Sequence, residues 1–272
     1  MTKIAPLTYR GVVELTGPDR ISFLNGLVSN DVAKAAPGRA VWAALLTPQG
    51  KYLLDLFVFS DGERLLLDVA RAEIPAFLQK LRRFKLRAQL DIADVSEKFN
   101  VHAIWAGTPP DRTFTVLDPR LPEAGYRSLD LPVQMSDTAT VADYAAHRIG
   151  LGLPDGAPDL EPDKTLLLEA GFDELNGIDW QKGCYMGQEL TARTKYRGLV
   201  KRRLLPVTLS QPDFKAGTAV HANGHEVGTI RSSAGTQALA MLQLSALNQP
   251  LSVAGSALTF HLPGWFKQPG LG

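Results

Sequence analysis

Cysteine is scarce in this chain, and long apolar runs are missing. The 272 residues include one cysteine, Cys184, which excludes an intramolecular disulfide framework and favours a reducing compartment. No apolar run reaches the roughly 18 residues of a membrane-spanning helix, and the N-terminal residues lack the apolar core of a secretory signal. We therefore expect a cytoplasmic protein that has no membrane partner.

A large charge of either sign is also missing. The formal net charge is +1, so charge-based recognition must come from local clusters. Two basic clusters are present, and they admit three interpretations: a solvated face, contact with a phosphate backbone, or recognition of an anionic small molecule. Few aromatic residues lie near them and no RNA-binding signature is present, so direct nucleic-acid binding is not expected. The clusters are Lys80, Arg82, Arg83, Lys85 and Arg87, and Arg193, Lys195, Arg197, Lys201, Arg202 and Arg203.

Histidine is rare, and its one suggestive spacing argues against a metal site. The stretch HANGH holds His221 and His225, and the Asn223-Gly224 pair between them is typical of a two-residue hairpin loop. In such a hairpin Ala222 pairs with His225, so the two histidines point to opposite faces of the strands. We expect no metal site there.

Turn signals and hydrophobic spacing predict an α+β body followed by a small β-barrel. Residues 9–93 are expected to form the order β-α-β-β-β-α-β, with the last strand over the strictly alternating residues 85–92. A further helix is expected over 137–150. Short strands between turn signals then replace the helical patterns, as in a barrel. We therefore predict an α+β domain over 1–200 and a β-barrel domain over 201–272.

The single cysteine lies in the stretch KGCYMGQELTAR. Gly183 and Gly187 on either side of Cys184 predict a tight turn with close backbone approach, and a helix is expected from Gln188 onward. A helix N-terminus and the nearby Lys182 both favour the thiolate form of the cysteine. The residues alone therefore indicate a reactive thiol, with a buried and inert cysteine as the alternative.

The stretch from NGIDWQKGC to KRRLLPV resembles the signature of the YgfZ family. The family pattern is K-G-C-[FY]-x-G-Q-E followed by an arginine and a glycine, and QELTAR with KRRLLPV looks most like its mitochondrial iron–sulfur assembly-factor branch. VVELTGPDRISFLNGLVSNDV and LLTPQGKYLLDLFVF extend the similarity to the folate-binding superfamily of the glycine-cleavage T-protein, with residues 95–160 matched weakly. The pattern is matched at Lys182, Gly183, Cys184, Tyr185, Gly187, Gln188, Glu189, Arg193 and Gly198.

This resemblance implies a GcvT-like fold, with ferredoxin-like antiparallel lobes and helices around a tetrahydrofolate site and a barrel at the C-terminus. It also implies a role in assembly or repair of iron–sulfur clusters in client enzymes, including radical enzymes that modify tRNA. The expected partners are reduced folate and iron–sulfur client or assembly proteins. The residues that carry over are Lys182, Cys184, Gln188 and Glu189 for the functional loop, and Asn30, Asp31 and Glu169 for folate contacts.

Two other functions stay open. The T-protein is an aminomethyltransferase, so a folate-dependent one-carbon transfer is the second interpretation, although its catalysis does not use a cysteine in such a loop. The third is direct RNA binding through the basic clusters. An iron–sulfur cluster usually takes about four protein ligands, mostly thiolates, and this chain offers one cysteine. We therefore expect transient contact, a mixed disulfide or a cluster shared with a partner, and no stably bound metal.

Overall fold

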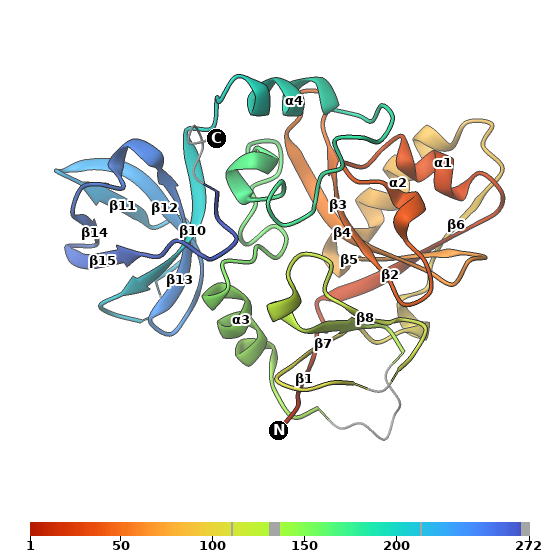
Figure 1. Cartoon of the computed structure of the whole chain (residues 1–272), viewed down its shortest axis with the longest axis horizontal. Coiled ribbons are helices and arrows are strands. Elements are labelled where there is room, and N and C mark those ends of the chain that lie inside the picture. Colours follow the sequence, from red (N-terminus) through yellow and green to blue (C-terminus); the bar gives the residue numbers. More distant parts are fainter. Residues whose placement is uncertain (110, 131–136, 213, 268–272) are drawn as a thin grey trace. The chain divides into compact units, whose positions relative to one another are not determined.

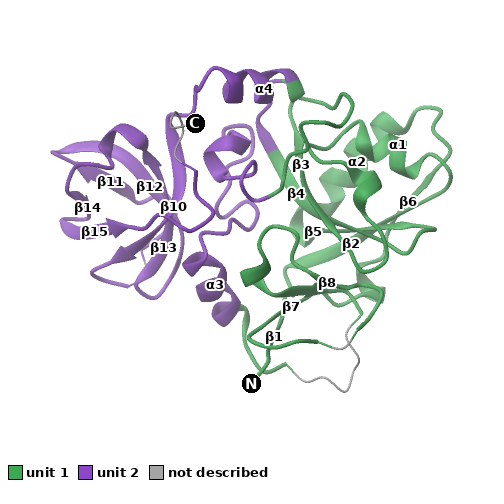
Figure 2. Cartoon of the chain, in the orientation of Figure 1, with its two compact units in different colours: residues 1–48, 53–141, 176–188 green, residues 49–52, 142–175, 189–272 purple. Residues whose placement is uncertain are grey.

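The chain folds into two compact units, and each unit is built from segments that are separate in the sequence. The computed structural model describes residues 1–109, 111–130, 137–212 and 214–267. Figure 2 colours the two units, which are described separately below. Unit 1 comprises residues 1–48, 53–141 and 176–188, and unit 2 comprises residues 49–52, 142–175 and 189–272.

A five-stranded sheet with two helices forms the main core of unit 1. The strand order is β3-β4-β5-β2-β6 (Figure 1). Helix α2 places Ile74, Phe77, Leu78 and Leu81 on the buried face, the spacing of one helical stripe. Each such side chain contributes about 1.5–3 kcal/mol when it leaves water. The elements are β2 (Arg10–Thr16), α1 (Arg20–Asn25), β3 (Val41–Leu46), β4 (Tyr52–Ser60), β5 (Leu65–Ala70), α2 (Ile74–Lys85) and β6 (Asp91–Asp94).

The predicted order of elements between residues 9 and 93 is confirmed, but the last strand is displaced. Helix α2 runs to Lys85, and pairing with β2 begins only at Asp91. Leu86 has φ +45° and is 88% exposed, although the alternating pattern predicts that it faces inward. The alternation was misleading because these residues form the turn that leaves the helix.

A second sheet in unit 1 is joined to the first through buried charge. Asp68 on β5 accepts hydrogen bonds from Arg10 Nε at 2.6 Å and from Arg127 Nε at 2.5 Å. The Arg127 guanidinium lies 4.0 Å from the centroid of the Phe57 ring, a cation–π distance. Paired and stacked in this way, the buried guanidinium groups are compensated. The second sheet has the order β1-β7-β9-β8, with β1 (Lys3–Pro6), β7 (His102–Trp105), β8 (Thr115–Leu117) and β9 (Tyr126–Ser128).

The predicted β-barrel is present in unit 2. Its strands close in the order β10-β13-β12-β11-β14-β15 (Figure 1). The predicted hairpin pairing is also confirmed, since Ala222 pairs with His225 and both Asn223 and Gly224 have positive φ, as a type I′ turn requires. The strands are β10 (Arg202–Leu209), β11 (Ala219–Ala222), β12 (His225–Ala234), β13 (Gln237–Gln243), β14 (Leu251–Val253) and β15 (Ser256–Phe260).

Helices and short 3-10 turns complete the chain. The predicted helix over 137–150 is observed as α3 (Val141–Gly150), and the helix expected from Gln188 is α4 (Gln188–Tyr196). None of the helices in the described part of the chain has the length and apolar character that crossing a bilayer requires. The division of domains at residue 200 stays a prediction. The 3-10 helices are η1 (Val32–Lys34), η2 (Arg71–Glu73), η3 (Ser96–Lys98), η4 (Pro122–Ala124), η5 (Leu167–Ala170) and η6 (Leu244–Ala246).

Candidate functional site

The cysteine-bearing loop of unit 1, residues 176–187, is bound along its length to the segment that follows α1. Backbone and side-chain groups of residues 26–30 supply the partners, some 150 positions earlier in the chain. Because the contacts are spread from one end of the loop to the other, the loop is held in a fixed path. The contacts are Asn30 Nδ2 to the Asn176 carbonyl at 2.7 Å, Ser29 Oγ to the Gly177 carbonyl at 2.6 Å, Asp179 N to the Ser29 carbonyl at 3.0 Å, and Met186 N to the Gly26 carbonyl at 3.3 Å.

Lys182 is the anchor at the centre of this loop. Its ammonium donates to the carbonyl oxygens of Asn25 at 2.7 Å, Val28 at 2.7 Å and Asn30 at 2.8 Å. All three N–H groups of an ammonium can thereby be used. Asn25 is the last residue of α1, where carbonyls have no partner within the helix and a cation is favourable. Lys182 therefore holds the loop in place, a structural role that the sequence does not indicate. That it favours the thiolate form of Cys184 stays a prediction.

The ammonium of Lys182 should titrate near pH 8. Burial lowers the pKa of Lys182 from 10.5 to about 8, and the carboxylates of Asp31 and Asp179 oppose that shift without cancelling it. Between pH 8 and 10.5 the unfolded chain keeps a proton that the folded chain has released. The contribution of this group to the free energy of unfolding should thus rise with pH in that window and be constant below it. Carbon NMR of labelled lysines measures the midpoint, with Lys182→Met to assign the signal; a midpoint near 10.5 contradicts the expectation.

A closed turn at Tyr185–Gln188 leads from the cysteine into α4. The backbone N–H of Gln188 donates to the Tyr185 carbonyl at 3.2 Å, and the Gln188 side-chain oxygen accepts from the Tyr185 N–H at 3.3 Å. Gly187 has φ +83°, a conformation that residues with a side chain rarely adopt. Tyr185 is buried, and its ring centroid lies 5.1 Å from the Lys182 ammonium.

Cys184 is exposed at this loop, so the burial that the alternative expected is not observed, and the reactivity of the thiol stays a prediction. The close backbone approach predicted at Gly183 is not observed, since a Cβ there would meet nothing within 4 Å. Glu189 and Arg193 are both exposed on α4, and no ion pair joins them among the described contacts. Most of the K-G-C-Y-x-G-Q pattern thus fixes the loop around one exposed thiol. Among the described residues, Glu189 and Arg193 make no contact within this loop.

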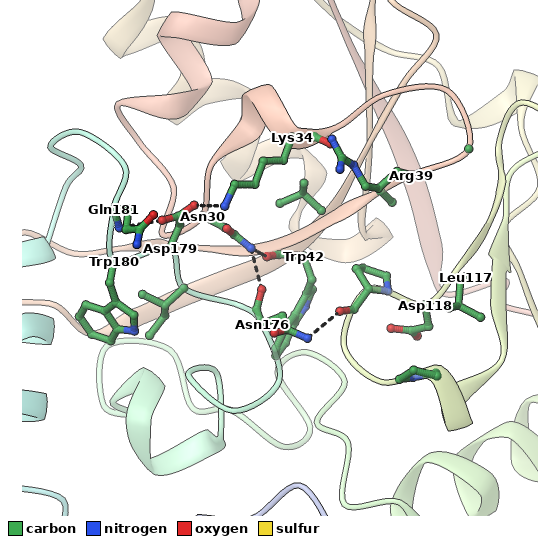
Figure 3. Close-up of a pocket in the computed structure, with 16 residues that line it drawn as sticks. Asn30, Lys34, Arg39, Trp42, Leu117, Asp118, Asn176, Asp179, Trp180 and Gln181 are labelled. Atoms are coloured by element: carbon green, nitrogen blue, oxygen red, sulfur yellow. Dashed lines mark hydrogen bonds and ion pairs between the residues drawn. The ribbon is translucent and has the colours of Figure 1, made fainter.

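A cavity of about 600 Å³ lies in unit 1 beside the start of the loop (Figure 3). Asn30 is part of its wall and is held in place, because its side-chain N–H₂ donates to the carbonyls of Trp42 and Asn176. Asp179 accepts from the ammonium of Lys34. Burial alone would raise the pKa of Asp179, but that bond and the backbone N–H groups of Gln181 and Lys182 lower it. The lining residues are Asn30, Lys34, Gly38, Arg39, Ala40, Val41, Trp42, Leu117, Asp118, Pro119, Pro122, Asn176, Ile178, Asp179, Trp180 and Gln181.

The chemistry of this cavity fits a reduced folate. Its volume is typical of small-molecule sites, which combine apolar walls with a few polar groups. Trp180 is partly exposed and offers apolar surface for a ring, whereas Trp42 is fully buried behind the wall. Arg39 is exposed at the same cavity and suits an anionic tail, and Lys34 is exposed there too but already pairs with Asp179. These residues would hold the ligand through ring contact at one end and charge at the other.

The three residues expected to contact folate are not gathered in this cavity. Asn30 lines it, whereas Asp31 is outside the lining set and caps η1 by accepting from the Ala33 N–H at 3.1 Å. Glu169 belongs to unit 2, where it is buried and pairs with both Nε and Nη2 of Arg202. No local motif in the sequence indicates four other lining residues, because they lie far apart in the chain: Lys34, Arg39, Asn176 and Trp180.

Comparison with known proteins identifies the family. Residues 201–268 match the model of the CAF17 C-terminal beta-barrel domain. The mitochondrial iron–sulfur cluster assembly factor IBA57 homolog of Mycosarcoma maydis is 34% identical over 94% of this chain and 68% of its own length. The chain belongs to the IBA57 family. The mitochondrial IBA57 of Mus musculus is 30% identical over 94% of this chain and 83% of its own length.

The IBA57 relationship refines the resemblance to the YgfZ family and agrees with the predicted fold. The aminomethyltransferase T of the glycine cleavage system from Bartonella henselae superposes with a TM-score of 0.76 at 15% identity. It covers 98% of this chain and 87% of its own length. At this identity the similarity shows the fold alone, and the predicted GcvT-like α+β fold with a C-terminal barrel is confirmed.

The cytoplasmic localisation predicted from the sequence is wrong, because the comparison with IBA57 proteins contradicts it. The IBA57 relatives from Mycosarcoma maydis, Mus musculus and Homo sapiens are each named as mitochondrial proteins, which points to mitochondria. The prediction failed because scarcity of cysteine reports the redox state of a compartment and does not distinguish one reducing compartment from another.

Proposed function

We propose that this chain is an accessory protein for assembly or repair of iron–sulfur clusters and that it acts through the Cys184 loop. The observation that carries the proposal is an exposed thiol on a loop anchored by Lys182, in a chain of the IBA57 family. A fixed loop loses little conformational freedom when the thiol engages a partner, so more of the interaction energy goes into binding. Clients are proposed to include radical enzymes that modify tRNA.

The number of cysteine ligands in the chain favours transfer or sharing of an iron–sulfur cluster over its storage. A cluster usually takes about four protein ligands, and the chain supplies one cysteine. The Cys184 thiolate would donate one sulfur ligand to an iron atom while a carrier or client supplies the others. Transient contact or a mixed disulfide with such a partner is compatible with the same geometry.

Loss of this chain should therefore lower the activity of cluster-dependent enzymes. Deletion of the gene is expected to reduce the activity of iron–sulfur enzymes several-fold and to spare enzymes of the same compartment that contain no cluster. A wild-type copy should restore the activity. Equal activity with and without the gene, under conditions that demand cluster synthesis, would refute the proposed function.

Reduced folate is proposed as the ligand of the cavity in unit 1. Calorimetry with tetrahydrofolate should show saturable heat, and Arg39→Glu should weaken binding about tenfold, or about 1.4 kcal/mol, by repelling the anionic tail. Arg82→Glu is the matched control, because Arg82 is an exposed arginine of α2 outside the cavity. Absence of heat at millimolar ligand with folded protein, or equal weakening by both variants, would contradict this assignment.

The alternative function is folate-dependent aminomethyl transfer. Its support is the fold shared with the aminomethyltransferase T of Bartonella henselae, which at this identity does not extend to activity. Incubation with tetrahydrofolate and an aminomethyl-loaded lipoyl carrier protein should give no methylene-tetrahydrofolate above the blank. Steady turnover in this assay would favour the transferase.

A further inference from the structure

A second cavity, contained wholly in unit 2, has walls that neither the cysteine loop nor the folate site uses. Its volume is about 650 Å³, and three leucines supply apolar surface. One of them, Leu199, is 45% exposed, so covering it with an apolar side chain would be favourable. The lining residues are Leu166, Glu169, Leu199, Lys201, Arg202, Gln243, Leu244 and Ser245.

The end of α4 places Leu199 at this cavity. Gly198 has φ +61°. The N–H of Leu199 donates to the Thr194 carbonyl at 3.0 Å, and that of Gly198 donates to the Lys195 carbonyl at 3.1 Å. This pair of bonds around a left-handed glycine is a Schellman motif. The exposure of Leu199 is thus set by regular, hydrogen-bonded backbone.

Two members of the second basic cluster, Lys201 and Arg202, line this cavity, and the fold divides the six members of that cluster into two groups. Three of its members pair with acids from residues 169–174: Lys195 with Asp173 at 2.9 Å, Arg202 with Glu169 at 2.9 Å, and Arg203 with Glu174 at 2.7 Å. Among the described residues, no ion pair involves the other three, which are exposed. These are Arg193, Arg197 and Lys201.

Helix α4 itself gains little from its own packing. Its buried residues are Thr191 and Thr194, and Tyr196 is 75% exposed. A helix with so small an apolar face is weakly held by a core. Exposed aromatic and arginine side chains, as on this helix, are typical of protein–protein contacts.

We propose that this cavity and the exposed side of α4 dock an acidic protein segment that carries a short apolar anchor. The anchor enters among Leu166, Leu199 and Leu244, and carboxylates of the segment meet Lys201, Arg197 and Arg193. The bidentate Arg202–Glu169 pair is neutral as a unit, so the positive charge at this cavity comes from Lys201. Such exposed charges mainly speed association and select the partner.

A nucleic acid suits this surface less well. Phosphate binding depends on cations and needs no apolar cavity, and single-strand binding adds aromatic platforms on which bases stack. The apolar part of the cavity lining is instead three leucines, and the exposed ring of Tyr196 is outside the lining set. The docking site is independent of the cluster-assembly role, because it requires neither the thiol nor a cluster.

Peptide binding to the full chain tests the proposal. The probe is the fluorescein-labelled peptide EDELLED, followed by anisotropy at low and at moderate salt. We expect saturable binding that weakens at least fivefold when both leucines are replaced by alanine (EDEAAED) or all acids by amides (QNQLLQN). Leu199→Ser and Lys201→Glu should each weaken binding at least fivefold. The matched controls Leu262→Ser and Lys215→Glu, at exposed positions of the same unit, should leave it unchanged.

Several results would overturn the docking site. They are the absence of binding at millimolar peptide, equal binding of the three peptides, and equal loss in the controls and the cavity variants. A labelled single-stranded RNA that binds more tightly than the peptide, with loss on Lys201→Glu and none on Leu199→Ser, would assign the surface to nucleic acid. Circular dichroism of each variant confirms that folding is retained.

Discussion

Replacement of Cys184 by alanine should abolish function and leave the fold intact. The thiol is exposed and the adjacent loop is held by other residues, so the free energy of unfolding should change by less than about 1 kcal/mol. In a strain that lacks the gene, the variant should restore cluster-dependent activity no better than an empty vector. Thermal unfolding of the purified variant checks that the fold is intact. The activity of cluster-dependent enzymes in the complemented strains checks the loss of function.

Cys184→Ser is the matched variant for this test. It keeps the size and polarity of the side chain but removes the sulfur ligand, so it should fail as Cys184→Ala does. Full rescue by either variant would show that the thiol is dispensable. A fall in melting temperature of many degrees would assign Cys184 a structural role instead.

Replacement of Lys182 by methionine should release the loop while the cysteine itself is retained. The variant keeps the length of the side chain but leaves three carbonyl oxygens without their donor. Unsatisfied acceptors of this kind cost about 1–3 kcal/mol, and roughly 1 kcal/mol lowers the melting temperature by about 2–4 °C in a chain of this size class. We expect a lower melting temperature, faster proteolysis within residues 176–187, and loss of rescue.

Lys215→Met is the control for the lysine substitution. Lys215 is exposed and forms no side-chain ion pair among the described residues, so melting, proteolysis and rescue should all match wild type. If Lys182→Met also matches wild type in proteolysis and melting, the three-carbonyl anchor does not hold the loop. If it alters only the reactivity of the thiol, Lys182 acts on Cys184 as the sequence predicted.

Local patterns were sufficient to predict most of the elements. The stripe from Ile74 to Leu81 indicates α2, and Asn223-Gly224 indicates the hairpin, because each signal lies within one element. Residues 85–92 were misassigned because alternation of leucine and charge also fits a turn that leaves a helix. The position of β6 depends on pairing with β2, which no short window of sequence contains.

The candidate site was predictable only where it is continuous in the chain. The loop 182–189 was found from its motif, but the use of Lys182 depends on carbonyls of Asn25, Val28 and Asn30. Main-chain oxygens have no signature in a sequence, because every residue carries one. The sequence of the second basic cluster likewise does not show which of its cations are neutralised. Asp173 and Glu174 precede the cluster in the chain and pair with Lys195 and Arg203 only in the folded structure.

Incorporation of radioactive iron into a cluster-dependent enzyme tests the assembly role most directly. The gene is deleted, and the enzyme is isolated after labelling from cells that carry the wild-type chain, Cys184→Ala or an empty vector, with protein amounts matched. The proposed function predicts that wild type restores iron incorporation and that Cys184→Ala remains at the level of the empty vector. Equal iron in all three would contradict an assembly role, and full incorporation with Cys184→Ala would contradict action through the loop.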